Sequence, residues 1–111
     1  MSLKQNQVAQ LDKAEAMVQD AIKKLLNPNA TATDKAQAAQ EIAEAGQIRQ
    51  QVAQGLNPQQ QQVLWQIGKL EWSAFQTVTG GASFGQVLDP VKAMSQAAQL
   101  SQELDNSILS A

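Results

Sequence analysis

Cysteine, histidine and tyrosine are all absent from this chain of 111 residues. Their absence removes disulfides, thiolate and imidazole metal ligands, cysteine nucleophiles and the ordinary histidine general base. A catalyst would have to act through carboxylates, hydroxyls, Lys and Arg alone, which leaves most hydrolase and oxidoreductase mechanisms without residues. The sequence therefore predicts a protein that is not an enzyme, with no catalytic residues, no cofactor and no metal.

Charge and long apolar runs are also scarce, with 16% charged residues and a formal net charge of -2. The basic residues are scattered from Lys4 to Lys92, with no cluster larger than Lys23 and Lys24, so we expect no nucleic-acid partner. No window approaches the roughly 18 apolar residues of a membrane span, and no signal-peptide run precedes the first helix. We expect no integral membrane segment and a cytoplasmic location by default. Because the chain has no cysteine, its cysteine content cannot distinguish a cytoplasmic location from non-classical secretion.

Glutamine and alanine dominate instead, with roughly 20 and 18 residues, well above average usage. Both are good helix formers, whereas the aromatic residues that favour strands make up only 4% of the chain. This composition predicts an all-α protein.

Apolar residues at three- and four-residue spacing predict four helices, separated by proline and glycine signals. The first covers residues 3–26, and the second is capped by Thr33 and ends at Gly55 in a left-handed conformation. The third covers 58–79 after the Asn57-Pro58 start, and the fourth begins at Asp89-Pro90 and frays over 107–111. The predicted inward positions of the fourth helix are Val91, Met94, Ala97 or Ala98, Leu104 and Ile108.

Helices of this length joined by short connections must run antiparallel to their neighbours. We therefore expect a single helical-bundle domain over residues 1–111, an antiparallel up-down bundle of three to four helices. Several of the helices carry few large apolar residues, and a chain of this size buries only about two-thirds of its unfolded surface. Self-association would complete such a core.

Two tryptophans, Trp65 and Trp72, lie seven residues apart and therefore share one face of the third helix. This face differs from the one that carries Leu64 and Ile67. One interpretation places the indoles at a partner contact, where tryptophan is enriched. The other places them inside the bundle, opposite alanine-rich helices. The candidate partner-contact residues are Trp65, Trp72, Phe75 and Phe84.

Two further motifs give weaker signals. Gly80 and Gly85 have phosphate-loop spacing, but Gln86-Val87 stands where Lys and Ser or Thr are required, so the segment predicts a flexible helix connection. A hinge that lets the last helix swing or exchange between chains is an alternative for the same glycines. Glu41 and Glu44 lie three residues apart and could form an acidic cluster with Asp12, Glu15 or Asp20. We expect these carboxylates to be solvated and paired with Lys13, Lys35 and Arg49.

These features predict a non-enzymatic protein–protein interaction or assembly module: a helical subunit, a secreted helper or a chaperone-like adaptor. Its partner would be another protein or a second copy in a homo-oligomer. The alternative is a small carrier that binds an apolar ligand in the bundle interior, lined by Met17, Met94, Leu64 and Phe75. Ordinary core packing explains the same four residues without a ligand.

Overall fold

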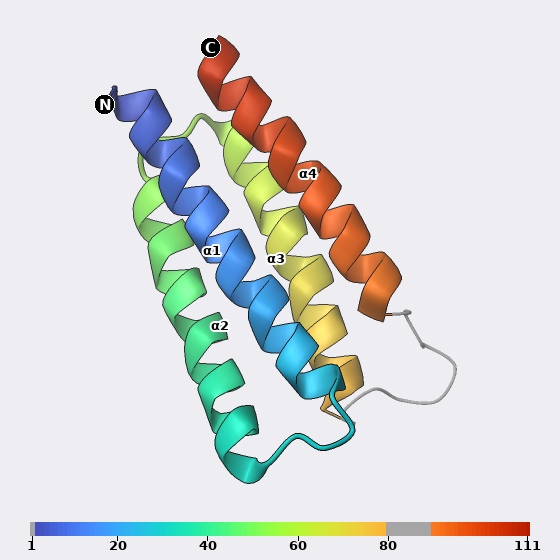
Figure 1. The fold of residues 1–111 in the computed structure, drawn as a ribbon. Coiled ribbons are helices and arrows are strands. Elements are labelled where there is room, and N and C mark those ends of the chain that lie inside the picture. Colours follow the sequence, from blue (N-terminus) through green and yellow to red (C-terminus); the bar gives the residue numbers. More distant parts are fainter. Residues whose placement is uncertain (1, 80–89) are drawn as a thin grey trace.

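The computed structural model describes residues 2–79 and 90–111, which form an antiparallel up-down bundle of four helices (Figure 1). The helices are α1 (Leu3–Leu26), α2 (Ala32–Ala53), α3 (Pro58–Val78) and α4 (Pro90–Ser110). No strand occurs within these described residues. The prediction of an all-α bundle is confirmed, and α1 begins at the same end of the bundle as α4 ends (Figure 1).

The helix starts follow from side chains that accept hydrogen bonds from free backbone N–H groups. Asn57 caps α3 and Pro58 is its first residue, as the sequence predicts. The predicted cap of α2 is wrong by two residues, because Thr31 and not Thr33 accepts from the Asp34 N–H, at 3.1 Å. Thr31 is the better cap because Asp34 then lies three residues on and returns a bond to the Thr31 N–H, at 3.0 Å. Asp89, the predicted cap of α4, lies outside the described residues.

Two predicted helix ends need correction. Gly55 follows α2 without a left-handed backbone, and the Nε2 at the flexible end of the Gln7 side chain would lie 2.7 Å from an added Cβ. The last turn of α4 does not fray before Ser110, and Ile108 within it is 2% exposed. Burial of this isoleucine holds the end of the helix in place.

The four helices pack unequally. The α1–α2 and α3–α4 pairs pack closely, and α1 meets α4 along a further seam. Although a short connection joins α2 to α3, these two helices share the least contact of the packed pairs. The α2–α3 side of the bundle is therefore its most open side.

Apolar side chains form two clusters along the bundle. The first cluster lies toward the end where α1 begins, and its buried members are Leu11, Val52, Leu56, Leu64, Ile67, Ala97, Leu104 and Ile108. The second cluster lies toward the other end, and its buried members are Ala14, Val18, Ile22, Ala45, Ala74, Ala93 and Met94. Val91 is 64% exposed and was wrongly predicted as core, because the inward line of α4 runs through Ala93 and Met94.

Candidate functional site

Both tryptophans lie on the surface of the folded chain. Trp65 is 60% exposed and Trp72 is 53% exposed. The interpretation that they fill volume inside the bundle is therefore wrong. Leu64, Ile67 and Ala74 occupy the inward line of α3 instead, so the indoles lie to one side of it.

The exposed indoles belong to a line of four residues on α3: Gln61, Trp65, Gly68 and Trp72. We call this line the tryptophan stripe. Gly68 sits between the two indoles, and a Cβ added to it would meet no atom within 4 Å. Packing within the chain therefore gives no reason for a glycine at this position.

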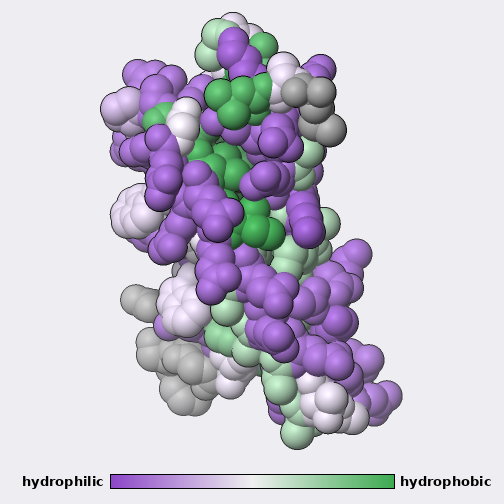
Figure 2. All heavy atoms as spheres, turned by 90° about the vertical axis from the view of Figure 1, so that its left-hand side faces the viewer, coloured by the Kyte–Doolittle hydropathy of each residue, from purple (hydrophilic) through white to green (hydrophobic). Residues whose placement is uncertain are grey.

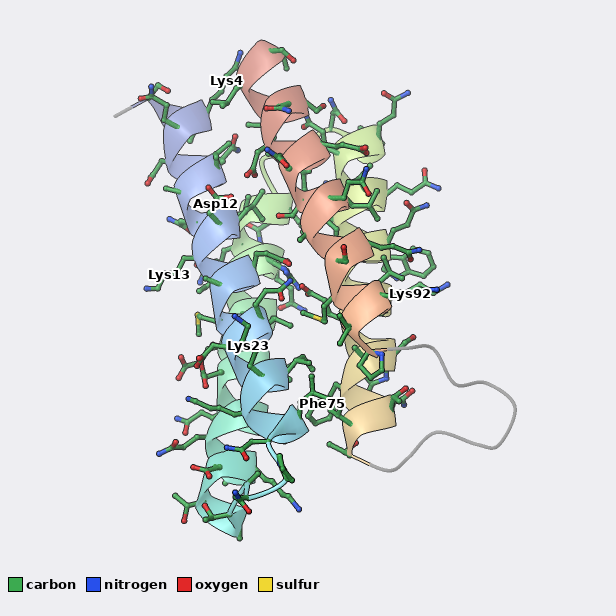
Figure 3. The ribbon with its side chains drawn as sticks, turned by 45° about the vertical axis from the view of Figure 1, so that its right-hand side comes forward. Lys4, Asp12, Lys13, Lys23, Phe75 and Lys92 are labelled. Atoms are coloured by element: carbon green, nitrogen blue, oxygen red, sulfur yellow. The ribbon has the colours of Figure 1, made fainter. Side chains whose placement is uncertain are left out.

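Neighbouring side chains restrict the two indole rings. The Lys69 Nζ lies 4.5 Å from the centroid of the Trp65 ring, a cation–π contact. The Trp72 and Phe75 rings stack with centroids 5.4 Å apart and an interplanar angle of 27°. Phe75 is half-buried, packs against the second cluster and points from α3 toward α1 (Figure 3). It anchors Trp72 to the core, while Phe84 lies outside the described residues.

A groove of about 390 Å³ runs beside the stripe, between α2 and α3. It is lined by Arg49, Gln50, Ala53, Gln61, Leu64, Trp65, Gly68 and Lys69. Figure 2 shows the face of the molecule that lies at the left of Figure 1, where a strip of hydrophobic atoms along the long axis is bordered by hydrophilic side chains.

Charged side chains from three helices meet inside the bundle. Arg49 of α2 lies between Glu15 of α1 and Glu71 of α3. The Arg49 Nη2 donates to the Glu15 Oε2 at 2.9 Å, and the Nη1 donates to the Glu71 Oε1. These side chains are 12%, 12% and 4% exposed for Arg49, Glu15 and Glu71. We call these three residues the charged layer.

The charged layer is also tied to α4. The Gln19 Nε2 donates to the Glu15 Oε1 at 2.8 Å and to the Met94 carbonyl oxygen at 3.2 Å. The hydrogen bonding is incomplete, since the Arg49 Nε and the Glu71 Oε2 are buried without a partner. Unpaired buried polar atoms cost free energy, so the layer is retained against a local penalty.

Burial raises the pKa of Glu71 to about 8; the neighbouring Glu15 carboxyl adds to this rise and Arg49 opposes it. On α4, burial and the facing Asp12 carboxyl raise the pKa of Asp105 to about 8. Both shifts favour the protonated form of these two carboxyl groups near neutral pH.

The acidic residues that the sequence groups around Glu41 have other partners. Lys24 Nζ lies 2.7 Å from the Glu41 Oε1 and 3.1 Å from the Asp20 Oδ2, while Glu44 is exposed. Of these carboxylates, Glu15 does pair with Arg49, but the pair is inside the bundle and not solvated. Over residues 2–79 and 90–111, no three acidic side chains are arranged to hold a metal ion.

The sequence prediction allowed for the Glu15–Arg49 pair but missed Glu71 and the burial of the charged layer, although the pattern carries a signal for both. The apolar line of α2 passes from Ala45 to Val52 through Arg49, and that of α3 passes from Ile67 to Ala74 through Glu71. A charged residue at an inward position in several helices indicates that the charges meet inside the bundle.

The four residues proposed for an apolar ligand are divided between different parts of the structure. Leu64 belongs to the first cluster and lines the α2–α3 groove. Met17, Met94 and Phe75 belong to the second cluster, and Met94 lines a groove of about 360 Å³ beside α1 and α4. The structure does not gather the four around one described pocket.

No family model matches the chain, and neither the curated proteins nor the solved structures contain a match to it. Along the described residues, no helix combines the length and apolar content that crossing a lipid bilayer requires. The exposed tryptophan stripe and the charged layer are therefore the features from which a function can be argued.

Proposed function

We propose that this protein is a non-enzymatic interaction module whose docking face is the tryptophan stripe of α3. The observation that carries the proposal is the exposure of Trp65 and Trp72, at 60% and 53%, on one side of a helix whose other side is packed. Large aromatic side chains are costly to leave in water and are enriched at the energetic centres of protein interfaces.

The rest of α3 suits a surface that loses its water on binding. Its only charged residues are Lys69 and Glu71, and Glu71 is buried. The exposed polar residues around the stripe are mostly glutamines, which carry no charge to desolvate. The contacts from Lys69 and Phe75 also hold the indoles in place before a partner arrives, which lowers the entropy cost of binding.

A double variant, Trp65→Ala with Trp72→Ala, separates docking from folding. Because both indoles are exposed, we expect its free energy of unfolding in dilute solution to stay within about 1 kcal/mol of the parent chain. We expect each substitution to weaken association by about 2 kcal/mol or more. Chemical denaturation followed by circular dichroism measures the first quantity.

Photo-crosslinking in the cells that make the protein tests the docking face directly. A photoreactive residue at Lys69, which is exposed and lines the groove beside the stripe, is expected to give defined adducts with protein that the double variant loses. The same residue at Lys13, which points away from the bundle in Figure 3, is the control and is expected to give no such adduct. The proposal fails if the photoreactive residue at position 69 forms no adduct, or if the double variant unfolds several kcal/mol more easily.

A further inference from the structure

We infer that the tryptophan stripe binds the same stripe of a second copy of this chain, with the two α3 helices antiparallel around a two-fold axis beside Gly68. This inference rests on the proposed function and names the partner. It follows from the spacing of the stripe, from the open position at Gly68 and from the distribution of charge on α3.

The spacing of the stripe is that of a helix-pairing seam. Gln61, Trp65, Gly68 and Trp72 are separated by four, three and four residues, which is the alternation of a coiled-coil contact line. In an antiparallel pair centred beside Gly68, Trp65 of each copy lies opposite Trp72 of the other. The same contact then forms twice, as a two-fold interface requires.

Gly68 lies at the crossing point of this pair. A glycine inside a helix costs about 1 kcal/mol relative to alanine, and an alanine here would meet nothing within 4 Å in the single chain. Removing the side chain at a helix crossing lets two helices approach at the low end of the usual ~8–10 Å separation. The close approach lets the flanking indoles of the two copies overlap, which accounts for a glycine at this position.

Charge favours a second copy over a partner of strong charge. The exposed surface of α3 carries no carboxylate, and Lys69 is its single cation. Glutamine amides both donate and accept, so a glutamine-rich face can hydrogen-bond to its own copy. Two-fold symmetry places the Lys69 side chains of both copies at the same rim, where solvent screens their repulsion.

The neighbouring face of α2 adds contact area. A single helix face, about 30 Å long, offers less contact area than the roughly 800 Å² per partner that a standard interface buries. The same symmetry brings the α2 sides of both copies together along the groove beside the stripe, where Ala53 is small enough to allow close approach.

Molar mass measured by light scattering from micromolar to millimolar concentration tests the pairing. We expect a dimer whose dissociation constant rises at least about 30-fold in Trp65→Ala. Gly68→Lys is expected to give a folded monomer, because it places bulk and like charge at the crossing. Ala16→Lys, on the exposed side of α1, is the matched control and is expected to keep the dimer.

Single cysteines test the antiparallel geometry, since the natural chain has none. Under mild oxidation, Lys69→Cys is expected to form a disulfide dimer because residue 69 lies beside the two-fold axis. Gln76→Cys, exposed on the same helix but far from the axis, is expected to form no disulfide between the copies. A parallel pair would join both variants and would overturn the inference.

The two proposals fail in distinguishable ways. A chain that is monomeric throughout, yet gives adducts from position 69 with a different protein, overturns self-pairing and keeps the docking face. A dimer that survives Gly68→Lys also overturns the inference, because the contact then lies elsewhere. A parent chain that forms neither a dimer nor any adduct from position 69 overturns both proposals.

Discussion

Glu71 is a carboxylic acid enclosed in the bundle with 4% of its side chain exposed. Burial raises its pKa from the model-peptide value of 4.5 to about 8, so the folded chain holds a proton that the unfolded chain releases at lower pH. Stability linked to this proton is fully present below about pH 4.5 and is lost as pH rises toward 8.

We therefore expect the free energy of unfolding to fall between pH 5 and pH 9, by on the order of 2 to 5 kcal/mol from this group. Glu71→Gln mimics the protonated acid and is expected to flatten much of this decline, leaving the part that Asp105 contributes in the same direction. Urea unfolding at a series of pH values measures the slope. Glu44→Gln, an exposed carboxylate on α2, serves as the control. An unchanged slope in Glu71→Gln would show that Glu71 ionises normally.

Sequence reasoning at this scale succeeded for some residues and failed for others. The two tryptophans could be placed on one face because the helix period fixes that relation. Their exposure could not be decided, because it depends on how far α2 stands from α3. The charged layer was missed because a single charge on an apolar line looks like an interruption until its partners on other helices are known.

At the scale of the element, the start of α2 shows how local chemistry sets a boundary. The sequence offers Thr31 and Thr33, and only Thr31 places Asp34 where both cap bonds form. The Thr31 N–H holds the pKa of the Asp34 carboxyl below its usual value. Proline starts were easier to predict, because Pro58 allows few alternatives to the first helical position.

Replacing these two threonines separately tests the cap. Thr31→Ala is expected to cost about 1 kcal/mol of stability, because the first N–H groups of α2 lose their acceptor. Thr33→Ala, inside the first turn, is expected to be neutral or slightly stabilising, since alanine is the better helix former. Thermal and urea unfolding of both variants compare them. Equal losses would contradict the assignment of the cap to Thr31.

At the scale of the whole molecule, the charged layer separates the two apolar clusters. Removing one member leaves the others buried without compensation, whereas replacing all three with apolar residues removes the desolvation cost as well. Arg49→Met alone is expected to cost about 3 kcal/mol or more. The triple variant Glu15→Leu, Arg49→Met, Glu71→Leu is expected to be as stable as the parent chain or more stable.

Urea unfolding of the single and triple variants measures this non-additivity. A triple variant that loses as much stability as Arg49→Met would mean that the layer itself stabilises the bundle.

The global arrangement of four antiparallel helices was predictable from helix lengths and connections. The open α2–α3 side was not, because it arises from the sum of many small side chains.

The position of the charged layer also limits how the helices can slide past one another. The stripes of small apolar residues on α1 and α2 would fit nearly as well after a shift of one turn, about 5.4 Å. Such a shift would carry Arg49 away from Glu15 and Glu71 and into the alanines of the second cluster, where no carboxylate meets it. The charged layer thus fixes the register of the helices, because its ion pairs form in only one alignment, although burying these charges lowers the stability of the bundle. Register in turn decides where Trp65 and Trp72 stand relative to α2.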